Sequence, residues 1–189
     1  VSDYTLKARI SGSGDALAID YQFTNGGAGP VLVTNKIWRM VEGKAKIDPD
    51  FVYAHVNSDG LLAIYKTMPN IPEGKSPTNL VAPYMTKVES GDRLSESITL
   101  QLPLLPYQEY FNNEPAADSD GNKLVQTVKE VAFGLAFFVP PEGSKIWNEK
   151  AFGENVDLFH NPPGKRAQYG VLWSERFKVS VPVYRRKEA

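Results

Sequence analysis

The chain has 189 residues, 21 of them basic and 22 acidic, which gives a formal net charge of -1. This balance excludes the basic electrostatic footprint of a nucleic-acid-binding protein. No apolar run reaches the ~20 residues that a membrane-spanning helix needs. The absence of cysteine excludes disulfides, thiolate metal sites and cysteine nucleophiles. We therefore expect neither a nucleic-acid partner nor a membrane span.

The first residue is Val1 rather than methionine. We interpret this as the removal of an upstream segment, for which an excised secretory signal is a natural explanation. We accordingly expect a periplasmic or secreted protein.

Apolar and polar side chains alternate along much of the chain. Successive side chains of a strand point to opposite faces, so this period predicts strands with one face in a core and one in water. In chain order, we expect strands over residues 4–10, 16–24, 31–40, 51–57, 61–67, 94–102, 128–139 and 170–184.

Two details sharpen this prediction. The segment 131–139 is apolar on both faces, which indicates a central strand that is covered on both sides or partly covered by a loop. The sequence NSDG at 57–60 predicts a tight hairpin between its flanking strands, with Gly60 supplying a positive φ.

We therefore predict an all-β fold, a single antiparallel two-sheet sandwich spanning residues 1–189. Three connections, 68–93, 103–127 and 140–169, exceed the ~12–15 residues usual for a structureless loop. We expect such connections to be functional, ordered by their own side chains or disordered, and only 103–127 has the composition of a mobile loop. The best helical candidate is a turn or two near 147–152.

Two stretches carry a resemblance to a known architecture. They are LAIDYQFTNGGAGPVLV at 17–33 and VESGDRLSESITLQLP at 88–103. The first is a strand followed by a Gly-rich turn and the start of the next strand, and the second is a Gly-Asp turn that leads into an alternating strand. Together they resemble the immunoglobulin-like sandwiches of bacterial surface and periplasmic proteins. A distant likeness to small sandwich-type protease inhibitors rests on the same stretches. The resemblance implies an architecture and no activity.

Immunoglobulin-like connectivity also implies where the loops lie. Loops two connections apart would emerge at the same end of the sandwich, so we expect 24–30, 68–93 and 140–169 to share one end and 103–127 to lie at the other. Elaborated loops at one end of a rigid sandwich are a common design for binding.

The aromatic residues of the long loops are the main candidates for ligand contact, because such rings anchor protein partners or carry sugars. Tyr107, Tyr110 and Phe111 belong to this group, with the alternative that they only order their loops. We take as candidate ligand-binding residues Trp147, Phe152, Phe159, His160 and Tyr84. The other histidine, His55, we interpret as a packed strand residue.

Carboxylates offer two further interpretations. Asp118, Asp120 and Asn122 surround a glycine turn and could suit Ca²⁺, but the bidentate carboxylate of an EF-hand is missing, so we favour a solvated turn. Asp48 and Asp50 lie in a polar turn. We expect no cofactor.

Three functions remain open at this point. The favoured one is a non-enzymatic binding or assembly domain of an exported bacterial protein, which uses the loops at the sandwich end to hold a protein or a glycan. The alternatives are a carboxylate-based hydrolase or its accessory module, and a protease inhibitor with a proline-stiffened loop.

Overall fold

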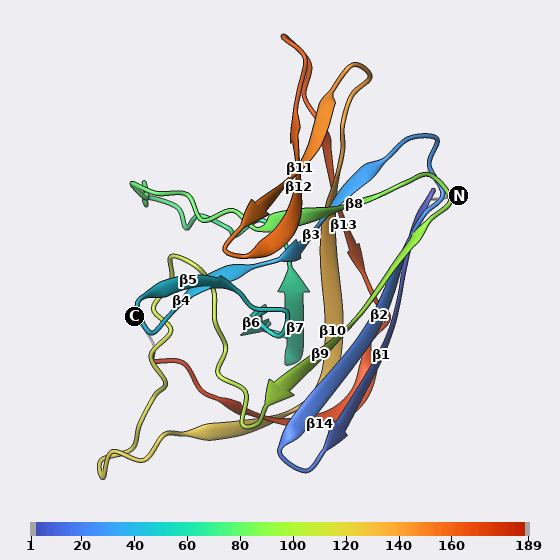
Figure 1. Cartoon of the computed structure of the whole chain (residues 1–189). Helices are drawn as coiled ribbons and strands as arrows, with labels where there is room; N and C mark the ends of the chain where they lie inside the picture. Colours follow the sequence, from blue (N-terminus) through green and yellow to red (C-terminus); the bar gives the residue numbers. More distant parts are fainter. Residues whose placement is uncertain (1–2, 188–189) are drawn as a thin grey trace.

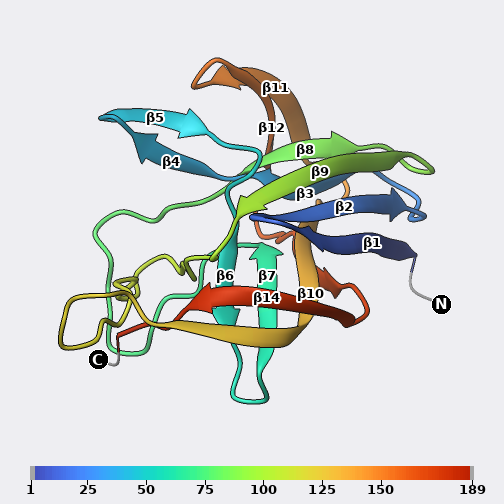
Figure 2. The same ribbon diagram turned by 90° about the horizontal axis from the view of Figure 1, so that it is seen from below.

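The computed structural model describes residues 3–187, and their regular structure consists of strands (Figures 1 and 2). Val1, on which the expectation of export rests, lies outside the described residues. Among residues 3–187 we find no helix with the length and apolar character required to cross a membrane.

Two sheets form the body of the molecule. The smaller has the order β1 (Tyr4–Ser13), β2 (Ala16–Asn25), β9 (Arg93–Gln101) and is antiparallel. The larger is centred on β10 (Val125–Val139). Its other strands are β3 (Val31–Lys36), β6 (Tyr53–Val56), β7 (Leu61–Lys66), β8 (Tyr84–Val88), β11 (Lys145–Ala151), β12 (Glu154–His160), β13 (Gln168–Trp173) and β14 (Phe177–Tyr184). A separate hairpin joins β4 (Trp38–Val41) to β5 (Lys44–Ile47).

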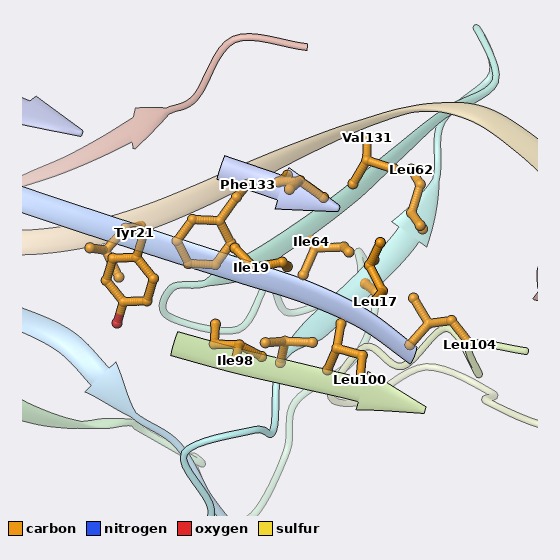
Figure 3. Packing of buried hydrophobic residues seen from close by; sticks show 14 of the residues in the cluster. Leu17, Ile19, Tyr21, Leu62, Ile64, Ile98, Leu100, Leu104, Val131 and Phe133 are labelled. Atoms are coloured by element: carbon orange, nitrogen blue, oxygen red, sulfur yellow. The ribbon is translucent and has the colours of Figure 1, made fainter. Parts of the chain in front are cut away.

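The main core lies between these two sheets, as the alternation predicts. From β2, the side chains Leu17, Ile19, Tyr21 and Phe23 are buried, and the Tyr21 ring packs 4.8 Å from that of Phe133 on β10 (Figure 3). Burying one such side chain contributes about 1.5–3 kcal/mol relative to leaving it in water. The all-β, sandwich-like architecture is therefore confirmed.

Two local predictions are confirmed as well. β6 and β7 form an antiparallel hairpin, and Gly60 in its turn has a φ of 84°. β10 is the central strand, because it pairs with β3, β7, β13 and β14. Its second face is also covered, with Ala132 and Ala136 buried.

The prediction of purely antiparallel sheets is wrong for one pair. β7 and β10 run parallel, with Leu62 opposite Val131 and Ile64 opposite Phe133. Parallel neighbours need a long crossover connection, and the chain between residues 66 and 125 supplies it by first passing through β8 and β9.

Most of the connection 140–169 is a hairpin rather than a loop, and the helical turn expected at 147–152 is wrong. β11 continues to Ala151, and Phe152 and Gly153 have φ values of 50° and 85°, as in the two-residue turns that suit the twist of a hairpin. Similarly, the connection 68–93 contains β8. The predicted strands 31–40 and 170–184 are each divided, into β3 and β4 and into β13 and β14.

The expected distribution of the loops is correct only in part. The β11–β12 hairpin does adjoin the 68–93 segment, through the pairing of β12 with β8, and Ser90 bonds to the carbonyl of Gly27 in the 24–30 turn. The first part of the connection 103–127, however, contacts residues 75–81 through Tyr110 instead of lying at the opposite end. The Tyr110 hydroxyl accepts a hydrogen bond from the Val81 N–H, and Lys75 donates to the Tyr110 carbonyl.

Candidate functional site

A groove of about 730 Å³ opens beside the β4–β5 hairpin. We call it the hairpin groove. Its walls come from three stretches that are distant in the sequence: residues 38–40 of the hairpin, the turn 48–51, and residues 104–109 of the second long connection, with the end of β9 as a further border.

An ion pair fixes the hairpin wall. Two guanidinium nitrogens of Arg39 donate to Asp48 Oδ2, at 2.9 and 2.6 Å, and the same guanidinium lies 5.2 Å from the centre of the Phe51 ring. The other Asp48 oxygen accepts the N–H of Asp50 at 3.0 Å. The polar turn predicted around Asp48 and Asp50 is thus a structural element of the groove wall.

Two further carboxylates line the groove, Asp50 in the same turn and Glu109 in the second long connection. Asp50 Oδ1 accepts the main-chain N–H of Thr99 at 2.9 Å, which caps the open edge of β9. Glu109 accepts a hydrogen bond from the Tyr107 hydroxyl at 3.3 Å, and burial raises the pKa of Glu109. Within residues 3–187, the second oxygens of Asp50 and Glu109 have no hydrogen-bond donor, so they are open to a ligand.

The groove has exposed apolar side chains at its rim, and most of the charged side chains that line it are acidic. Met40 and Leu105 line the groove with 60% and 43% of their surface exposed, and exposed apolar side chains that gather in one place are typical of contact surfaces. Among the described residues that line the groove, Arg39 is the one basic side chain, against the carboxylates of Asp48, Asp50 and Glu109. The groove therefore suits an apolar ligand that is neutral or positively charged.

Two of the predicted site residues lie at one end of this groove. The Trp38 ring, which lines the groove, is 5.7 Å from Phe152 in the β11–β12 turn, and Phe152 is 5.9 Å from Tyr84 on β8. The Trp38 indole N–H donates to the carbonyl of Ala82 at 3.1 Å. The three rings therefore link the hairpin, β8 and the β11–β12 hairpin.

The other three predicted residues lie elsewhere. Trp147 is exposed on β11, and its indole N–H donates to Glu149 at 3.0 Å. Phe159 faces the other side of the hairpin, since it pairs opposite Ile146, and packs 5.6 Å from Phe138. His160 is exposed at the end of β12. The five residues therefore do not form one patch.

The remaining sequence candidates have structural roles. Asp118 accepts the side-chain amide of Asn122 at 3.1 Å and the N–H groups of Asn122 and Asp120 at 2.8 and 2.9 Å, and these bonds lower the pKa of its carboxyl. Across residues 3–187, no group of three or more His, Asp or Glu side chains could hold a metal ion. His55 is half-buried, with Nδ1 3.2 Å from the Tyr65 hydroxyl.

Comparisons with protein-family models, with curated proteins and with solved structures find no match to this chain. The interpretation of the hairpin groove therefore rests on its own geometry. Sequence reasoning missed Trp38 and Glu109 as groove residues. The alternation of residues 38–40 and of residues 44–47, on either side of the turn at Glu42 and Gly43, is a signal that could have revealed the hairpin.

Proposed function

We propose that the protein is a non-enzymatic binding domain of an exported assembly, and that the hairpin groove holds an extended segment of a partner protein. The observation that carries the proposal is the combination of exposed apolar side chains, Met40 and Leu105, with open carboxylate oxygens on Asp50 and Glu109. This combination suits a segment that presents apolar side chains and at least one Lys or Arg. The immunoglobulin-like resemblance and export belong to the same proposal.

The aromatic rings of the groove favour a polypeptide over a glycan. A sugar platform needs a free, flat ring face. The Phe51 ring is covered by Arg39, and Tyr107 is stacked on Tyr53 at 6.4 Å. Met40 is flexible and adapts to apolar side chains of varied shape, which is a property of peptide-binding surfaces.

The carboxylates support binding rather than hydrolysis. Both oxygens of Asp48 are occupied, by Arg39 and by the N–H of Asp50, and Asp50 also holds the edge of β9. A carboxylate hydrolase needs one group as acid and a second as base or nucleophile, whereas these side chains hold the groove wall in place.

A selection experiment tests the proposal. A library of random peptides displayed on phage is selected against the wild-type protein, and the enriched peptides are assayed against Met40→Arg, which places a long cationic side chain over the groove. The matched control is Val125→Arg, since Val125 is 46% exposed and does not line the groove. A glycan array is probed in parallel.

We expect enriched peptides to combine apolar and basic residues, and we expect Met40→Arg to weaken them at least tenfold, a loss of about 1.4 kcal/mol. The control should bind like the wild type. Peptides that bind Met40→Arg and the wild type equally well would overturn the proposal, and glycan binding that is lost in Met40→Arg would replace the peptide with a sugar.

A further inference from the structure

Three polar side chains point into the space between the two sheets at positions that the alternation reserves for apolar residues. Lys66 follows Leu62 and Ile64 on the inner face of β7, and it is fully buried. Asn35 follows Val31 and Val33 on β3 and is 1% exposed. The third, Glu96, lies on β9 of the opposite sheet and is partly buried.

Hydrogen bonds connect the three residues, and so link β3, β7 and β9. Asn35 Nδ2 donates to Glu96 Oε1 at 2.7 Å. The Lys66 amine donates to the main-chain carbonyl of Asn35 at 3.0 Å. The Thr34 hydroxyl donates to the Lys66 carbonyl at 3.1 Å, which ties the two strands together beside the side chains.

The carboxylate of Glu96 is held on its other side as well. The Tyr21 hydroxyl donates to Glu96 Oε2, and the Tyr21 ring is fixed against Phe133 in the core (Figure 3). Burial strongly raises the pKa of Tyr21, so Tyr21 stays a neutral donor. Glu96 is therefore positioned with one oxygen directly on the side-chain amide nitrogen of Asn35.

The hydrogen bonds of the Lys66 amine match its neutral form. Among the described residues, Nζ has two acceptors, the carbonyls of Asn35 and Pro49 at 3.0 and 2.7 Å. A neutral amine has two N–H donors, which these carbonyls satisfy, and it keeps a free lone pair. Burial also lowers the pKa of Lys66, which favours the neutral amine. A buried, uncharged lysine is a nucleophile.

The side-chain carbonyl of Asn35 is the natural target. Within residues 3–187, its Oδ1 is buried and has no hydrogen-bond partner, although most buried polar atoms in proteins are paired and each exception requires a reason. We propose that Lys66 and Asn35 are joined by an intramolecular isopeptide bond, and that Glu96 carries the proton for its formation.

The reaction is a balanced acyl transfer and needs no oxidant or co-reactant. The lone pair of Lys66 Nζ forms a bond to Asn35 Cγ, and Glu96 takes a proton from the nitrogen that becomes positively charged. Glu96 then delivers this proton to Nδ2, the bond between Cγ and Nδ2 breaks, and ammonia leaves. The product is an amide that links β3 to β7, and Glu96 returns to its starting state.

Intact-protein mass spectrometry of the folded wild-type protein tests this proposal. We expect a mass lower than that of the unmodified chain by one ammonia, and a branched proteolytic peptide that contains both Asn35 and Lys66. Glu96→Gln keeps the shape of the side chain but cannot carry the proton, so we expect it to slow bond formation by about 10²–10⁴-fold. The control Lys129→Met removes an exposed lysine and should keep the loss of ammonia.

The wild-type protein decides the result by itself, whether or not the variants fold. A folded wild-type protein with the full mass would overturn the proposal, and so would a loss of ammonia that peptide mapping places at another residue. A denatured sample provides a further check, because the three strands meet only in the fold. We expect a chain that is synthesised and kept in denaturant, and so has never folded, to keep the full mass until it is allowed to fold, and ammonia loss from such a chain would also contradict the proposal.

Discussion

The bond between Asn35 and Lys66 makes a quantitative prediction for stability. It closes a loop of about thirty residues, and a cross-link of that span stabilises a fold by roughly 3–4 kcal/mol at 25 °C through the entropy of the unfolded chain. Glu96→Gln protein that is assayed before the slowed bond forms should therefore have a free energy of unfolding lower by at least this amount. In a chain of this length, that corresponds to a decrease in Tm of roughly 6–16 °C.

A double-mutant cycle measured by urea denaturation separates the cross-link from the local hydrogen bonds of Glu96. In a Lys66→Met background no bond can form, so Glu96→Gln should lose only its polar contacts there. We expect Glu96→Gln to cost roughly 3–4 kcal/mol more in the wild-type background than in the Lys66→Met background. A difference below about 1 kcal/mol, typical of an ordinary hydrogen bond, would refute the reasoning.

Three further predictions concern the fold. Burial lowers the pKa of His55 below its ordinary value of 6.5, so the unfolded chain binds more protons than the folded one below that pH. Stability should thus fall as the pH falls through the folded-state pKa, and His55→Gln should remove this dependence in denaturation curves between about pH 5 and pH 7. Phe133→Ala should lower the free energy of unfolding by about 3–5 kcal/mol, because Phe133 is fully buried and its loss leaves a cavity; a cost below about 1 kcal/mol would contradict its place in the core. A Cβ at Gly170 would lie 2.7 Å from the buried Phe137 ring, so Gly170→Ala should cost about 1–3 kcal/mol in the same assay, and an unchanged Tm would show that the ring is free to move.

The strands that the sequence predicts well are those with strict alternation and a recognisable turn. β2 is the example, since Leu17, Ile19, Tyr21 and Phe23 are spaced by two and all are buried. The β11–β12 hairpin escaped detection for the opposite reason. Its turn is Phe152-Gly153 rather than the usual Asn-Gly or Asp-Gly pair, and the exposed and partly buried residues around it show no clean period.

The buried polar residues were visible in the sequence as exceptions to the alternation. Glu96 lies between Leu94 and Ile98 on the apolar face of its strand, and Lys66 continues the apolar face of Leu62 and Ile64. Each exception by itself looks like a strand end or an edge. Their convergence depends on two sheets that face each other and on the parallel pairing of β7 with β10, neither of which sequence separation can reveal.

The hairpin groove shows the same limit. Asp48 and Asp50 have the composition of a solvated turn, and Trp38 appeared to continue a long strand. The strand ends at Lys36, and the chain then forms the separate β4–β5 hairpin. This places Trp38 against Phe152 and makes the hairpin one wall of the groove.

Hydrogen–deuterium exchange on the complex with a selected peptide tests the proposed binding site most directly. We predict that the peptide slows exchange in residues 38–41, in the turn 48–51 and in residues 104–109, and that the other exposed surfaces are unchanged. A second exposed apolar surface, formed on β13 by Tyr169, Val171 and Trp173, serves as the internal comparison. Protection confined to β13, with no change at the hairpin groove, would contradict the account.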